Sequence, residues 1–152
     1  MKLPVVPSEV LTAALSPAGG ASGGLVFEPG FGAHIVRTAL TMWESDQLRE
    51  TFVGLLRSAV TSEQAAVMLR EFIADSILAT ITRVAGLDVR GSAAEAEYRA
   101  AMVATQMLGL ALTRLLLRLP AVAGASVDEL AATVGPSVER YLTGEIVLPA
   151  GH

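Results

Sequence analysis

The most regular feature of the sequence is a helical repeat of apolar residues, and this repeat is widest between Ser92 and Leu119. On a helical wheel, the polar side chains of the segment fall in one arc and leave roughly two thirds of the circumference apolar. A helix at the surface of a domain needs an apolar stripe only a little over about 100° wide. We therefore predict a helix that is buried on two sides. Its second neighbour is either another part of the same chain or the same helix of a second copy.

The same repeat predicts further helices over residues 9–15, 31–43, 46–59, 61 to about 86, and 127–143. Three capping boxes mark helix starts, because a Ser or Thr oxygen accepts an orphan amide and a Glu or Gln three residues later reaches back. These boxes are Ser92 with Glu95, Thr61 with Gln64, and Ser126 with Glu129. Gly135 and Pro136 interrupt the last helix, but its apolar stripe continues in phase, so we expect a kink there.

Alternation with a period of two residues is nowhere sustained, so the sequence predicts an all-α fold of about six helices. We divide the chain into three parts. Residues 1–29 form a short helix and a Gly- and Pro-rich loop, residues 30–144 form the helical domain, and residues 145–152 form a disordered tail.

Composition and the distribution of charges indicate the class of protein and its compartment. Of its 152 residues, 52% are hydrophobic and 17% are charged, so we expect one domain with part of its surface hidden in an oligomer. The longest charge-free stretch of the apolar helix, between Arg99 and Arg114, is shorter than the roughly 18 residues that span a membrane. Pro4 and Pro7 argue against a secretory signal, so we expect a cytoplasmic protein.

Candidate chemistry is sparse. The absence of cysteine excludes disulfides and sulfur-ligated metal sites, and the net charge of −4 without a basic cluster argues against binding of nucleic acid by this chain. His34 has no second histidine or cysteine at ligand spacing, so we predict neither a metal nor a cofactor. Glu71 and Asp75 fit a solvated helix face better than a catalytic pair, and Ser58 lacks a nucleophile elbow. We therefore predict that the protein is not an enzyme.

A pocket in a helical domain is lined by apolar and aromatic side chains with a few polar groups. Our candidate ligand-binding residues are His34, Met42, Trp43, Phe52, Arg57, Met68, Phe72, Met102 and Gln106. Each is also compatible with an ordinary packed core, because methionine fills irregular gaps as readily as it contacts ligands. The amide of Gln106 either contacts a ligand, contacts a partner chain or faces solvent.

Three segments carry a family resemblance: Leu55–Glu63, Val103–Ala111 leading to Arg114, and Glu139–Gly144. With the order of helices, they resemble the C-terminal regulatory domain of the tetracycline repressor (TetR) family of bacterial transcription regulators. The resemblance implies a homodimer in which the last two helices of each copy form a four-helix bundle, and a pocket for a small apolar effector. The interface residues that we expect are Ala101, Thr105, Leu108, Gly109, Leu112, Leu116, Val134, Val138 and Tyr141.

The resemblance also implies an N-terminal helix-turn-helix, whereas this chain starts with Met1-Lys2-Leu3-Pro4 where that head would end. We therefore expect contact with DNA only through a helix-turn-helix domain that this sequence does not contain. The first hypothesis is an effector-sensing and dimerising domain. The alternatives are an interaction module that binds no ligand, and a carrier of apolar small molecules unconnected with transcription.

Overall fold

The structure is a computed structural model that describes residues 30–78 and 93–151, and all regular elements in these ranges are helical. The predicted short helix at 9–15, the glycine-rich loop and the Ser92 cap lie outside the described residues. The helices are α2 (Phe31–Trp43), α3 (Asp46–Thr61), α4 (Glu63–Phe72), α6 (Ala93–Ala111), α7 (Pro120–Ala123) and α8 (Val127–Thr143). Two π-helical turns extend α4 and α6, namely η1 (Ile73–Leu78) and η2 (Leu112–Leu116). The all-α prediction is confirmed.

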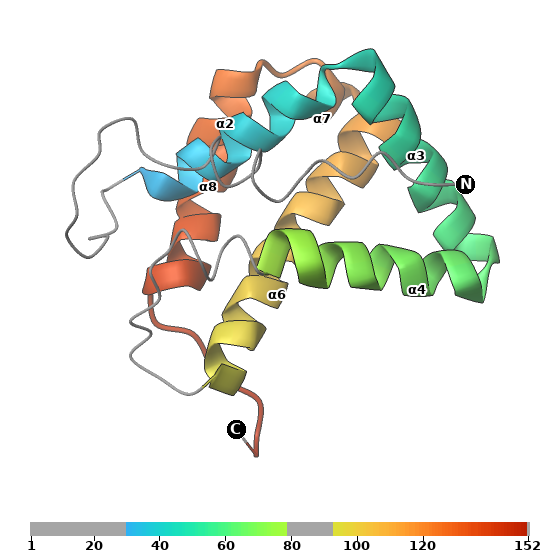
Figure 1. Ribbon diagram of the computed structural model, residues 1–152. Helices are drawn as coiled ribbons and strands as arrows, with labels where there is room; N and C mark the ends of the chain where they lie inside the picture. Colours follow the sequence, from blue (N-terminus) through green and yellow to red (C-terminus); the bar gives the residue numbers. More distant parts are fainter. Residues whose placement is uncertain (1–29, 79–92, 152) are drawn as a thin grey trace, which may run out of the picture.

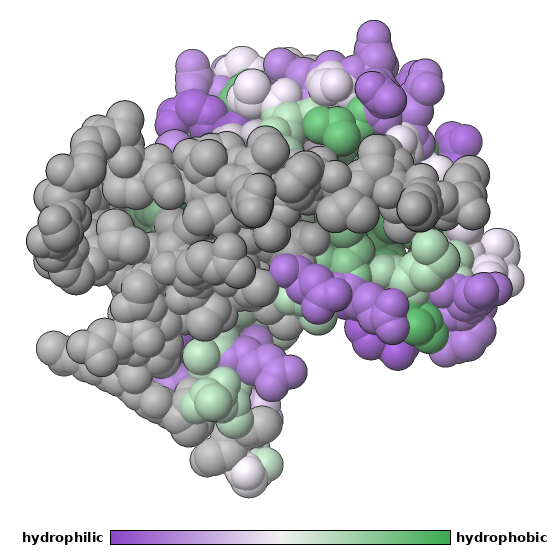
Figure 2. All heavy atoms as spheres, in the orientation of Figure 1, coloured by the Kyte–Doolittle hydropathy of each residue, from purple (hydrophilic) through white to green (hydrophobic). Residues whose placement is uncertain are grey.

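Helices α2, α6 and α8 pack together, while α3 and α4 form a corner that projects from them (Figure 1). The corner formed by α3 and α4 contacts the rest of the domain at two places: η1, which follows α4, contacts α6, and α3 contacts η2. In the view of Figure 2, hydrophilic side chains gather along the top and around α4, with hydrophobic side chains visible between them. The described part of the chain is therefore a three-helix layer with a two-helix arm.

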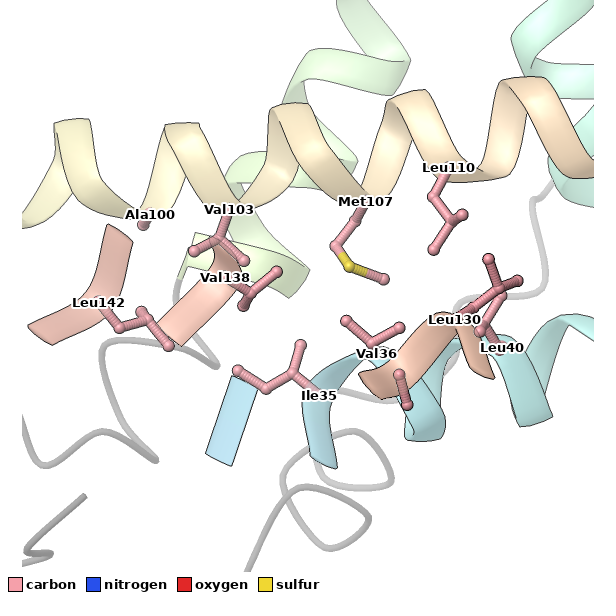
Figure 3. Close-up of a cluster of buried hydrophobic side chains, with 11 residues drawn as sticks. Ile35, Val36, Leu40, Ala100, Val103, Met107, Leu110, Leu130, Val138 and Leu142 are labelled. Carbon is pink, nitrogen blue, oxygen red and sulfur yellow. The ribbon is translucent and has the colours of Figure 1, made fainter. Parts of the chain in front are cut away.

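The core lies between the three packed helices (Figure 3). It is built from apolar residues at helical spacing on each of them. The principal members are Ile35, Val36 and Leu40 of α2, Val103, Met107 and Leu110 of α6, and Leu130, Val138 and Leu142 of α8. Full burial of one such side chain contributes about 1.5–3 kcal/mol of transfer free energy.

Arg99 of α6 and Arg114 of η2 donate hydrogen bonds to backbone carbonyls at the two ends of α8. Arg99 Nη1 donates to the carbonyls of Tyr141 and Gly144, both at 2.9 Å. Arg114 Nη1 donates to the carbonyls of Val122 and Ala125, at 2.7 and 2.8 Å, just before α8 begins. These bonds satisfy carbonyls that no helix bond can reach, and they fix where α8 lies along α6.

Several predicted boundaries agree with the structure. Helix α2 has the predicted limits, and α8 begins with the predicted capping box, in which Ser126 Oγ accepts from Glu129 N and Glu129 Oε2 accepts from Ser126 N. Helix α8 continues through Pro136 as one helix, as predicted.

Other boundaries were wrong. We predicted Thr61 as the cap of α4, but α3 continues to Thr61, so this residue lies inside a helix. The cap is Ser62, whose Oγ accepts from Ala65 N at 3.3 Å. The predicted long helix changes to a π-turn at Ile73. The central helix is regular only to Ala111, and the short helix α7 after it was not predicted.

Candidate dimerisation face and ligand-binding residues

The face of α6 that points away from the core carries small side chains. Thr105 and Gly109 are exposed, and Ala101 is half-buried beside them, as is Leu112 at the start of η2. No atom outside the helix lies within 4 Å of the position that a Cβ on Gly109 would take. The Thr105 hydroxyl donates to the carbonyl of Ala101 at 2.9 Å within the same helix. This face therefore has small side chains and open space beside it, and the hydroxyl group of Thr105 already has a hydrogen-bond partner.

The other predicted interface residues divide into two groups. The first group is half-buried and keeps some free surface; it consists of Leu108 on α6, Leu116 on η2, and Val134 and Tyr141 on α8. Val138 is completely buried, with 0% of its surface exposed, because it packs between α2 and α6 in the core. The apolar stripe of α8 that contains Val138 is covered within its own chain, so this residue has no surface to offer a second copy.

The predicted ligand-binding residues lie on four helices. They are half-buried, apart from the exposed Arg57: His34, Met42 and Trp43 on α2, Phe52 on α3, Met68 and Phe72 on α4, and Met102 and Gln106 on α6. The structure brings Trp43 and Phe52 together, with ring centroids 5.5 Å apart and ring planes 10° from parallel. This stacked pair joins the start of the α3–α4 arm to the three-helix layer.

His34 differs from the other candidates in its polar chemistry. Its Nε2 is buried, and the structure gives this atom no hydrogen-bond partner. The ring lies beside that of Phe31, with centroids 6.4 Å apart and planes 28° from parallel. Phe31 was not one of our candidate ligand-binding residues, although its spacing of three residues from His34 places the two side chains side by side on a helix.

The described residues contain no group of three or more His, Asp or Glu side chains that could hold a metal ion. Glu71 and Asp75 are both exposed, as expected for a solvated helix face. The carboxyl of Glu129 has a pKa below its usual value because it accepts from the backbone and side chain of Ser126. That shift belongs to the helix cap, so it indicates no reactive group.

Comparisons with known proteins agree with this architecture. The family model described as "Tetracyclin repressor-like, C-terminal domain" matches residues 30–142. The chain belongs to this family. Among solved structures, it is similar to the crystal structure of a TetR-family regulator from Streptomyces coelicolor A3, with 28% identity, a TM-score of 0.56, and coverage of 90% of this chain and 80% of that one. No curated protein sequence matches the chain.

The family match confirms the resemblance drawn from the sequence and the TetR-like helical fold. TetR-family regulators are generally non-enzymatic transcription factors. In the part of the chain that the structure describes, no helix is long and apolar enough to cross a membrane.

Proposed function

We propose that this TetR-type domain senses a small apolar effector and holds two copies of the chain together, as the regulatory part of a transcription regulator in the bacterial cytoplasm. In this proposal, a helix-turn-helix domain of the kind found in the family binds the DNA. In this proposal the domain performs no catalysis and needs no cofactor. Its action is to change the relative position of two DNA-binding heads when an effector binds.

The outer face of α6 is the observation that carries the dimer. Exposed Thr105 and Gly109 alternate with half-buried Ala101, Leu108 and Leu112, so the face is apolar or small along its length. The hydroxyl of Thr105 is bonded inside the helix, so contact with a second copy would leave no polar group of that side chain unpaired. Small residues allow two helix backbones to approach closely, and a two-fold dimer would place this face against itself.

Helix α8 supports a four-helix arrangement. It packs along α6 and is held there at both ends by Arg99 and Arg114. Val134 and Tyr141 keep free surface on the same helix. Two copies that meet through α6 would therefore bring two pairs of packed helices together.

Sedimentation velocity at micromolar concentration tests the dimer. We expect the wild-type chain to sediment as a dimer and Gly109→Leu to sediment as a monomer, because the larger side chain separates the two α6 helices. The matched control is Gly54→Leu, since Gly54 is also an exposed helical glycine with no atom within 4 Å of its Cβ position, but lies on α3. A Gly109→Leu variant that remains dimeric would overturn this interface.

Effector sensing is supported by the composition of the half-buried positions on α2, α3, α4 and α6. These positions include the aromatic residues Trp43, Phe52 and Phe72 and the methionines Met42, Met68 and Met102, and such side chains adapt to apolar ligands. Trp43 is the single tryptophan of the chain and stacks on Phe52, so its emission reports on this region. We expect titration with apolar aromatic compounds to change Trp43 fluorescence in a saturable way. A flat response across a broad panel would leave the ligand-free interaction module as the function.

A further inference from the structure

The turn η2 lies between the α3–α4 arm and the start of α8. It continues α6, it contacts α3 of the arm, and it contacts α7, which leads into α8. Helices α3 and α7 both lie at the end of α6 that carries η2 (Figure 1). A change in the shape of η2 would therefore act on the arm and on α8 together.

The hydrogen bonds of η2 differ from those of the regular helix before it. The amide of Leu117 donates to the carbonyl of Leu112, five residues back, at 2.9 Å. The Thr113 hydroxyl donates to the carbonyls of Gly109 and Leu110, at 2.8 and 3.2 Å. A π-turn of this kind is rare, and it often occurs at functional sites. An α-helical turn, with bonds to the carbonyl four residues back, is the alternative arrangement of the same segment.

The residue that follows η2 has a strained backbone. Arg118 has a φ of 51°, in the left-handed region that is unfavourable for a residue with a Cβ. Leu117 and Leu119 on either side of it are exposed, so burial of their side chains does not offset this strain. The amide of Leu119 donates to the carbonyl of Thr113 in η2 at 2.9 Å. Strain persists only where neighbouring contacts hold it, and this bond supplies such a contact.

Arg114 connects η2 with the start of α8. Its Nη1 donates to the carbonyls of Val122 and Ala125, at 2.7 and 2.8 Å. Ala125 directly precedes Ser126, the N-cap residue of α8. The bonds are charge-assisted and therefore stronger than bonds between neutral groups. Any rotation of η2 about the helix axis must displace the start of α8 or break these two bonds.

We propose that η2 is a two-state switch that couples the arm to α8, with Arg114 as the residue that transmits the movement. In the state described here, η2 is a π-turn and Arg114 holds the start of α8. When α3 moves away, η2 changes to α-helical bonding, which turns Arg114 about the helix axis and releases α8. A discrete two-state element that both sites bias is the physical basis of such coupling. The inference rests on the proposed effector sensing, which would move α3, but its test needs no effector.

Amide hydrogen exchange, measured by NMR, tests the coupling. Leu56→Ala loosens the arm, because Leu56 is the buried residue of α3. The readout is the start-to-end ratio, which is the exchange rate of the Leu130 amide in the first turn of α8 divided by that of the Gly144 amide at its end. We expect Leu56→Ala to raise this ratio about fivefold. The matched control is Leu142→Ala, at a buried leucine near the far end of α8, which should not raise the ratio.

Arg114→Met tests the transmission. In this background, we expect Leu56→Ala to leave the start-to-end ratio unchanged. The amide exchange of Leu117, which is bonded within η2, should still rise, because α3 continues to act on the turn. Arg99→Met is the matched control, since Arg99 bonds two carbonyls at the other end of α8. In that background the fivefold response should persist.

Thr113→Val tests the π-turn itself. The substitution removes the hydroxyl that bonds two carbonyls of α6 and keeps the shape of the side chain. We expect the exchange of Leu117 and the start-to-end ratio to rise, as they do in Leu56→Ala. The matched control is Thr41→Val, because the Thr41 hydroxyl also donates to the carbonyl four residues back, that of Arg37, at 2.8 Å in α2. This control should leave the ratio unchanged.

The outcomes separate this inference from the proposed function. Equal responses to Leu56→Ala and Leu142→Ala overturn the coupling, and so does a response that persists in Arg114→Met. Either result leaves the proposed effector sensing and dimer intact. Loss of the response in Arg99→Met as well overturns the specific role of Arg114. If the responses are as expected but no compound changes Trp43 fluorescence, the coupling stands and effector sensing fails.

Arg114→Lys keeps the test decisive if Arg114→Met does not fold. An ammonium group lacks the planar fork of the guanidinium, so it cannot reproduce both carbonyl bonds in the same geometry. We expect the response of the start-to-end ratio to Leu56→Ala to be reduced in this background. A full fivefold response would overturn the role of Arg114.

Discussion

Gly32 of α2 and Gly135 of α8 occupy a helix crossing that is too close for any side chain at either position. A Cβ on Gly135 would lie 2.6 Å from the Cα and 2.7 Å from the amide nitrogen of Ala33. A Cβ on Gly32 would clash with the carbonyl oxygen of Gly135 and lie 2.7 Å from the amide nitrogen of Glu139. Backbone atoms cannot rotate away, so the two glycines set the distance between the helices.

Alanine at either glycine should therefore destabilise the domain. We expect Gly135→Ala to lower the free energy of unfolding by about 1–3 kcal/mol, because overpacking at the crossing exceeds the gain in helix propensity. The control is Gly54→Ala, at an open position in α3, which should raise stability by about 0.5–1 kcal/mol. Urea denaturation monitored by circular dichroism measures both. Equal effects of the two substitutions would show that the crossing tolerates a methyl group.

The sequence predicted the class, the limits of α2 and the capped start of α8, because these elements carry local signals. A continuous apolar stripe and a cap residue identify a helix without reference to its neighbours. Gly135 was interpreted only as an interruption of the last helix, since the residue that it faces, Gly32, is about a hundred positions away in sequence. Periodicity shows that a stripe is buried, but it does not show which helix covers it.

The same limitation explains Val138 and the end of α6. Val138 lies on the expected stripe, but α2 covers it, as only the tertiary structure shows. The apolar repeat does not report the polar contacts of the π-turn η2. The Thr113 hydroxyl donates to the carbonyls of Gly109 and Leu110, at 2.8 and 3.2 Å, and Arg114 donates to the carbonyl of Val122, beyond the turn. The positive φ of 51° at Arg118 then directs the chain away from the helix axis toward Pro120. For the candidate site, the sequence predicted residues that are in fact half-buried. It could not predict that Nε2 of His34 is buried without a hydrogen-bond partner, because this depends on the tertiary structure.

Arg99 should contribute more to the free energy of unfolding than the exposed ion pairs among the described residues. Its Nε donates to Glu95 Oε1 at 3.0 Å, with side chains 15% and 16% exposed, and its Nη1 bonds two carbonyls at the end of α8. Arg99→Met removes all three bonds and leaves polar groups in a poorly solvated position. We expect a loss of about 2–3 kcal/mol in unfolding free energy.

The matched control for Arg99 is Arg49→Met. Arg49 also pairs with an acidic residue on its own helix, Asp46, at 2.6 Å, but these side chains are 45% and 83% exposed. Solvent screening limits such a pair to about 0–1 kcal/mol. Thermal denaturation of both variants, with Arg99→Lys as an intermediate, measures the difference. If Arg49→Met were as costly as Arg99→Met, the two carbonyl bonds would have no special role.

The capping box of α8 should make stability depend on acidic pH. The Ser126 hydrogen bonds lower the folded pKa of Glu129 below its ordinary value of 4.5, because they favour the ionised carboxylate. A lowered folded pKa contributes stability that is complete above the unfolded pKa and is lost as pH falls through the folded pKa. We therefore expect Glu129→Gln to lower stability at pH 7 and to have a smaller effect below about pH 4. Denaturation series of the wild-type chain and of Glu129→Gln at pH 3 and 7 measure the two differences. A Glu129→Gln effect of the same size at both pH values would exclude the carboxylate as the stabilising form.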